Sequence, residues 1–126
     1  MTRKSQEKWQ KILNNILAAI ILFTIGQAMI WFQTNGQFIW PWAKEHPWIM
    51  AMCGLPISYI LIIATKFVVA GFDGLLWPGR LVGFGSGMVV MAILTWMFMG
   101  EGINLKTLTS LILATGLVCV QVFWKI

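Results

Sequence analysis

The chain has 126 residues, of which 59% are hydrophobic and only 10% are charged, and its formal net charge is +5. Soluble domains are about 45–50% apolar and about 25% charged, so a water-soluble globular domain is excluded. The positive charges cluster at the ends of apolar segments, which argues against a nucleic-acid partner. A cleaved signal peptide is not expected, because the first apolar run is long and no small-residue cleavage site follows it.

Four long apolar stretches follow one another along the sequence. Each has about 18–23 residues, which at a rise of about 1.5 Å per residue matches the ~30 Å of the hydrocarbon layer. Backbone groups in lipid must be satisfied internally, so helices are expected. The prediction is an all-α membrane protein in which residues 1–126 form a single domain of four transmembrane helices, at about 12–32, 48–70, 79–99 and 107–124.

Lysine and arginine are distributed unequally between the two ends of these segments. Two cations, Lys44 and Lys106, fall on one side of the predicted bundle. The positive-inside rule therefore places both termini in the cytoplasm, in a membrane of the bacterial inner type. This bias also predicts a single orientation, so we do not expect an antiparallel homodimer, although a homo- or hetero-oligomer is expected. Seven cations lie on the cytoplasmic side: Arg3, Lys4, Lys8, Lys11, Lys66, Arg80 and Lys125.

The stretch "GRLVGFGSGMVV" contains glycines at intervals of four residues, Gly79, Gly83 and Gly87. A phosphate-binding loop is excluded because the lysine of GxxxxGK[ST] is missing and no βαβ unit surrounds the glycines. The interval places all three on one face of a helix, where a neighbouring helix can approach closely. The alternatives are that these glycines leave room for a substrate or permit a kink. Gly116 in the last segment is also assigned to helix packing.

The last third of the chain resembles the small multidrug resistance proteins, four-helix members of the drug/metabolite transporter superfamily. The resemblance lies in "GFGSGMVVMAILTWMFMGEGINLKTLTSLILATGLVCVQ", with a weaker match at "LFTIGQAMIWFQTNG" followed by "WP". It implies a small transporter whose first three helices line a cavity while the fourth mediates assembly. The family's membrane-embedded glutamate corresponds here to Phe23, which can bind neither a proton nor a cation.

Polar residues inside the apolar segments are the candidates for substrate binding. Arg80 and Lys66 suggest an anionic or phosphate-bearing ligand, since a guanidinium binds phosphate or carboxylate through paired hydrogen bonds. Tyr59 shares a helix face with Lys66, and Gln27 lies deeper in the first segment. The alternatives are that Lys66 extends to the membrane surface, that Arg80 pairs with Asp73 or with lipid phosphate, and that Gln27 makes an interhelical hydrogen bond.

No set of residues indicates catalysis or a bound metal. Cys53 and Cys119 are far apart in apolar runs, and the single histidine, His46, lies next to a proline in a connection. No catalytic residue, metal site or cofactor is therefore predicted, and the chain is not expected to be an enzyme.

Three functions are compatible with these features. The first is a small transporter or transporter subunit of the drug/metabolite type. The second is an accessory subunit that docks on a larger membrane complex through its glycine face, and the third is a protein that binds the anionic headgroup of a membrane lipid.

Overall fold

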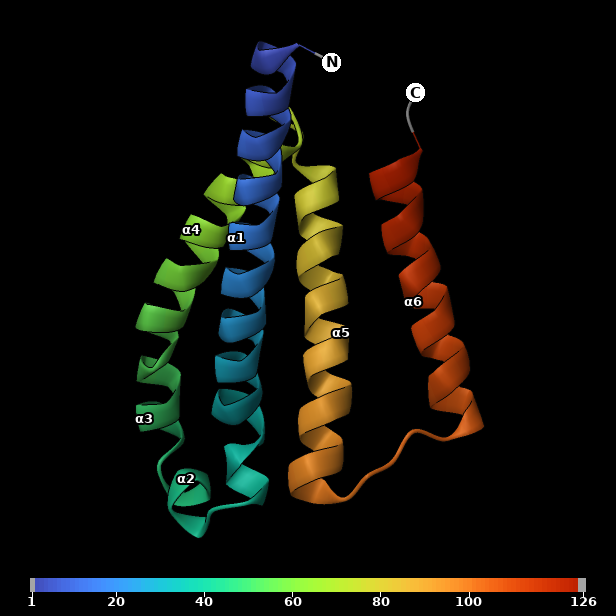
Figure 1. Ribbon diagram of the computed structural model, residues 1–126. Helices are drawn as coiled ribbons and strands as arrows, with labels where there is room; N and C mark the ends of the chain where they lie inside the picture. Colours follow the sequence, from blue (N-terminus) through green and yellow to red (C-terminus); the bar gives the residue numbers. More distant parts are fainter. Residues whose placement is uncertain (1, 125–126) are drawn as a thin grey trace.

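The computed structural model describes residues 2–124, and within them the chain is helical (Figure 1). Helices α1, α4 and α5 run side by side, α6 stands on the other side of α5, and both ends of the chain lie at the same end of the bundle. In chain order the elements are α1 (Arg3–Asn35), the 3₁₀ turn η1 (Gly36–Phe38), α2 (Pro41–Glu45), α3 (Pro47–Met52), α4 (Gly54–Gly71), α5 (Trp77–Met99) and α6 (Leu105–Phe123).

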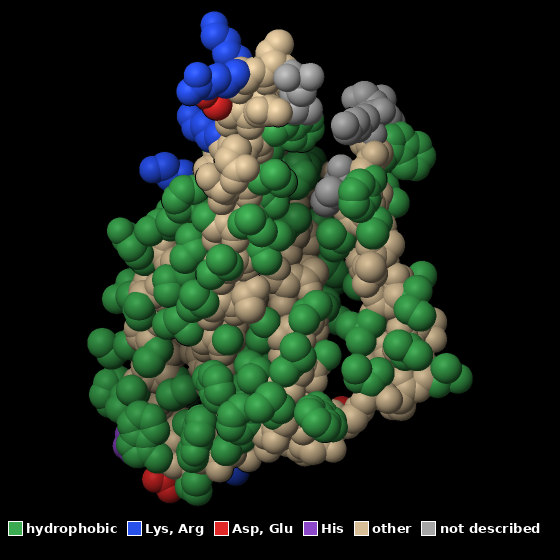
Figure 2. All heavy atoms as spheres, viewed as in Figure 1, with side chains coloured by type: hydrophobic (Ala, Val, Ile, Leu, Met, Phe, Trp, Pro, Cys, Tyr) green, Lys and Arg blue, Asp and Glu red, His purple; other side chains and the backbone are tan. Residues whose placement is uncertain are grey.

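Three helical segments are long and apolar enough to cross a membrane: Arg3–Phe38, Pro47–Gly71 and Trp77–Met99. Leu105–Gln121 is a shorter apolar helix. The predicted all-α class is thus confirmed, and the three long segments indicate an integral membrane protein. Hydrophobic side chains cover most of the face seen in Figure 2, while basic side chains gather at the end where α1 begins. A surface this apolar is suited to lipid rather than to water.

Helix α1 begins nine residues earlier than predicted. The Thr2 side chain caps its first turn by accepting a hydrogen bond from the backbone N–H of Ser5, at 3.2 Å. The polar residues that follow include Lys, Glu and Gln, which favour helix even without apolar periodicity. Because the helix has 33 residues, it is about 50 Å long and exceeds the ~30 Å hydrocarbon layer.

The predicted second helix, residues 48–70, is interrupted at Cys53, between α3 and α4. Pro56 explains the position of the break. Proline has no N–H to donate to the carbonyl four residues earlier, and its ring clashes with that carbonyl, which here belongs to Met52. The predicted third and fourth helices correspond to α5 and α6, and their ends differ by at most two residues.

The core lies where α1, α4 and α5 meet. It is formed by the buried residues Ala19, Phe23, Ala64 and Val68. Small residues bring α1 and α4 together: a Cβ atom added at Gly71 would lie 2.6 Å from Ile16 Cγ1. Close approach of this kind is what holds helices together in lipid, where apolar side chains gain nothing by leaving water.

Helix α6 packs against α5 and forms no part of this core. The connection before it starts at Gly100, which ends α5 in the left-handed conformation at φ 68°. Asn104 then caps α6 by accepting a hydrogen bond from the backbone N–H of Thr107, at 2.8 Å. The fold therefore has a tight three-helix unit and a fourth helix attached to one side of it.

Candidate functional site: a cavity between α1, α5 and α6

The glycines of α5 lie against α1 and α4. A Cβ atom at Gly79 would lie 2.5 Å from Cγ1 of Val68 in α4. At Gly83 it would lie 3.2 Å from the ring of Phe23 in α1, and at Gly87 2.9 Å from Oε1 of Gln27. The interval of four residues thus forms a surface, here called the glycine face, on which two neighbouring helices pack.

Gly116 is in a different position. A Cβ atom added there would meet no other atom within 4 Å, and the residue is exposed on α6. Among the described residues, then, Gly116 has no helix packed against it.

Two polar side chains of α1 make hydrogen bonds across to α5. Gln27 donates from Nε2 to the backbone carbonyl of Gly83, at 3.4 Å. Trp31 donates from its indole Nε1 to the hydroxyl of Thr95, at 3.1 Å, and both residues are buried. A hydrogen bond between helices in a membrane contributes about 1 kcal/mol. These contacts fix the register of α1 against α5.

The four predicted substrate ligands do not converge on one cavity. Lys66 and Arg80 are exposed, and the Tyr59 side chain is 66% exposed. None of the three lines any of the cavities described here, whereas Gln27 lines a small one of about 110 Å³ between α1 and α5. None of these four cavities is lined by both cations.

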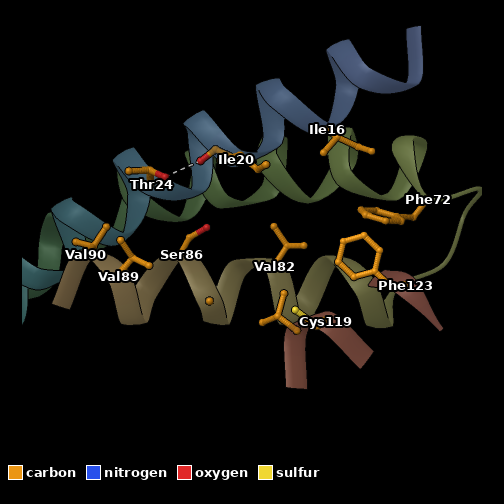
Figure 3. Close-up of a pocket in the computed structure, with 12 residues that line it drawn as sticks. Ile16, Ile20, Thr24, Phe72, Val82, Ser86, Val89, Val90, Cys119 and Phe123 are labelled. Carbon is orange, nitrogen blue, oxygen red and sulfur yellow. Dashed lines mark hydrogen bonds between the residues drawn. The ribbon is translucent and has the colours of Figure 1, made fainter. Parts of the chain in front are cut away.

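A much larger cavity of about 460 Å³ lies between α1, α5 and α6 (Figure 3). The cavity exists because α6 packs against α5 but does not pack against α1. Phe72, which precedes the turn between α4 and α5, lines one end. The side chains and glycine that line it come from all three helices and this turn: Ile16, Ile20, Thr24, Phe72, Val82, Gly85, Ser86, Val89, Val90, Val118, Cys119 and Phe123.

The lining is almost entirely apolar, with three small polar groups. The Thr24 hydroxyl donates to the carbonyl of Ile20 at 2.8 Å, and the Cys119 thiol is free. The Ser86 hydroxyl makes no hydrogen bond to any described residue, and it points from α5 toward α1 across the cavity. A volume in the range of 300–1,000 Å³, apolar walls and a few polar groups are typical of ligand sites.

No pattern in the sequence indicates this cavity. Gly85 and Ser86 were visible as small residues beside the glycine face, and their size is what keeps the wall of the cavity open. The second wall depends on where α6 sits, which no local pattern specifies.

Charged groups are absent from the interior: every Lys, Arg, Asp and Glu between residues 2 and 124 is exposed. In the same range, His, Cys, Asp and Glu form no group of three that could hold a metal ion.

Comparison with protein-family models, curated proteins and solved structures finds no match to this chain. The cavity is therefore interpreted from its own chemistry.

Proposed function

We propose that this chain is a transporter subunit of the drug/metabolite type for amphiphilic molecules, with all four apolar helices crossing the membrane and both termini in the cytoplasm. The apolar part of the substrate occupies the cavity between α1, α5 and α6. This cavity is the observation that carries the proposal, because its walls are apolar while the Ser86 hydroxyl in them is free to bind a polar group. The subunit works in a homo- or hetero-oligomer with other membrane helices.

The geometry favours an amphiphile over the small anion suggested by Arg80 and Lys66. A small anion needs converging donors, and these two exposed cations line no described cavity. An apolar chain needs only a space of the right polarity, and transferring it from lipid into an apolar cavity breaks no hydrogen bond. An accessory subunit, the alternative function, would need no molecule bound in the cavity.

Leaflet exchange of a fluorescent phospholipid tests the proposal. Proteoliposomes containing the full chain and a phosphatidylethanolamine labelled with nitrobenzoxadiazole on its acyl chain are treated with dithionite, which bleaches only the outer leaflet. The chain is expected to move labelled lipid from the inner to the outer leaflet, where dithionite bleaches it. Ser86→Leu fills the cavity with a branched side chain and is expected to slow this several-fold.

Ser58→Leu is the matched control, because Ser58 is exposed on α4 and lines none of the cavities described. It should keep the rate of the unaltered chain. Bleaching no faster than in protein-free liposomes, or equal rates for both leucine variants, would reject a transport role for the cavity and favour the accessory subunit. Circular dichroism and gel filtration show whether each variant is folded.

A further inference from the structure

Another cavity, of about 300 Å³, lies at the end of the bundle where α1 begins. Four α1 residues and one residue of the turn between α4 and α5 line it: Ser5, Lys8, Trp9, Ile12 and Asp73. It presents an ammonium and a carboxylate, which the large cavity lacks, together with a hydroxyl and an indole. We call the cavity lined by these five residues the polar cavity.

The polar cavity adjoins the apolar one along two elements. Ile12 lines the polar cavity and Ile16 lines the apolar cavity, and they are one turn apart on the same face of α1. In the turn after α4, Phe72 belongs to the apolar cavity and the next residue, Asp73, to the polar one. A molecule that lies along α1 can therefore reach both.

The polar cavity also lies at the right depth for a lipid headgroup. Helix α1 is about 20 Å longer than the hydrocarbon layer, so its first turns extend into the headgroup region. Trp9 is 54% exposed there, at the level where indole rings are enriched in membrane proteins. The apolar cavity begins about one helical turn deeper.

Two opposite charges line this cavity without neutralising each other. Among residues 2–124 the structure contains an ion pair between Arg3 and Glu7, at 3.4 Å, and none between Lys8 and Asp73. Asp73 is held in the turn at φ 55°, a conformation that Asp and Asn tolerate better than most residues. Its carboxylate and the Lys8 ammonium are thus both available to a ligand.

We infer that the two cavities together bind one zwitterionic phospholipid, with an acyl chain in the apolar cavity and the headgroup in the polar cavity. The headgroup ammonium pairs with the Asp73 carboxylate, and its phosphate pairs with the Lys8 ammonium. A primary ammonium suits this arrangement because it donates hydrogen bonds to a carboxylate. An anionic headgroup with no ammonium would leave Asp73 without its pair. This inference rests on the proposed function, since it names the substrate class of the same site.

Native mass spectrometry of the purified full chain tests the inference. The chain is titrated with phosphatidylethanolamine or with phosphatidylglycerol of identical acyl chains. Phosphatidylethanolamine adducts are expected to be several-fold more abundant. Asp73→Asn keeps the side-chain shape and tolerates the same backbone conformation, and it is expected to reduce phosphatidylethanolamine binding to the level of phosphatidylglycerol. Lys8→Gln is expected to weaken the binding of both lipids.

Glu101→Gln removes an exposed carboxylate on the connection before α6, outside both cavities, and should leave the preference unchanged. Equal binding of the two lipids, or an unaltered preference in Asp73→Asn, would overturn the inference. If the lipids bind equally and Ser86→Leu still weakens both, the apolar cavity and the proposed function stand without the headgroup assignment. The proposed function fails as well if Ser86→Leu leaves either the binding of the lipids or the rate of dithionite bleaching unchanged.

Discussion

Replacing Gly79 with alanine is expected to lower the free energy of unfolding by about 1–3 kcal/mol, the cost of overpacking a close-fitting core. The new Cβ atom would lie 2.5 Å from Cγ1 of Val68, a contact that requires movement. Val68 is fully buried, and its branched side chain has few alternative rotamers, so it cannot turn aside. Helices α4 and α5 would have to separate. Thermal unfolding in a single detergent or in bicelles measures the effect.

The same substitution at Gly116 is the control, because alanine there would meet nothing within 4 Å. Alanine favours helix over glycine by about 1 kcal/mol, so Gly116→Ala is expected to be neutral or stabilising. The comparison separates packing from helix propensity, which acts in the same direction at both sites. Equal unfolding temperatures for the two variants would show that the glycine face does not hold α4 and α5 together.

Removing the Phe23 ring is expected to have the largest effect on stability in the chain. Phe23 is 7% exposed within the core, and its ring lies against Gly83, so alanine would leave a space between α1 and α5. Phe→Ala substitutions in protein cores lower stability by about 3–5 kcal/mol. We expect a loss of up to this size, because part of that value reflects transfer from water, which lipid does not provide.

Phe84→Ala is the matched control on the adjoining helix. Phe84 is 44% exposed, and its removal should change stability by less than about 0.5 kcal/mol, as for most surface substitutions. Chemical unfolding of both variants, followed by circular dichroism, makes the comparison. A Phe23→Ala protein as stable as Phe84→Ala would place the core elsewhere than among α1, α4 and α5.

The helices were largely predictable from the sequence, because long apolar runs are a strong signal that depends on no tertiary detail. The start of α1 was not predictable, because the polar segment before residue 12 lacks the regular spacing of apolar residues that marks a helix. Its helical structure depends on the cap at Thr2. The spacing of Gly79, Gly83 and Gly87 indicated a shared face, and the structure adds which helices lie against it.

The binding site was harder to predict than the fold. Lys66 and Arg80 are candidate ligands because charges in apolar segments are rare, but a sequence does not show whether two such side chains converge. The cavity arises from the distance between α6 and α1, which is set by packing on α5. In the sequence, Lys8 is one of the cytoplasmic cations and Asp73 is a possible partner of Arg80, and only their lining of one cavity brings the two together.

Alkylation of the two native cysteines measures the occupancy of the cavity most directly. Both thiols are exposed, but Cys119 lines the apolar cavity, whereas Cys53 lies at the break between α3 and α4 and lines none of the cavities described. The full chain in detergent is titrated with phosphatidylethanolamine, and the rate of N-ethylmaleimide modification at each thiol is followed by mass spectrometry. If a lipid chain enters the cavity, modification of Cys119 slows several-fold while that of Cys53 is unchanged. Equal rates at every lipid concentration, or equal slowing of both thiols, would contradict a binding site between α1, α5 and α6.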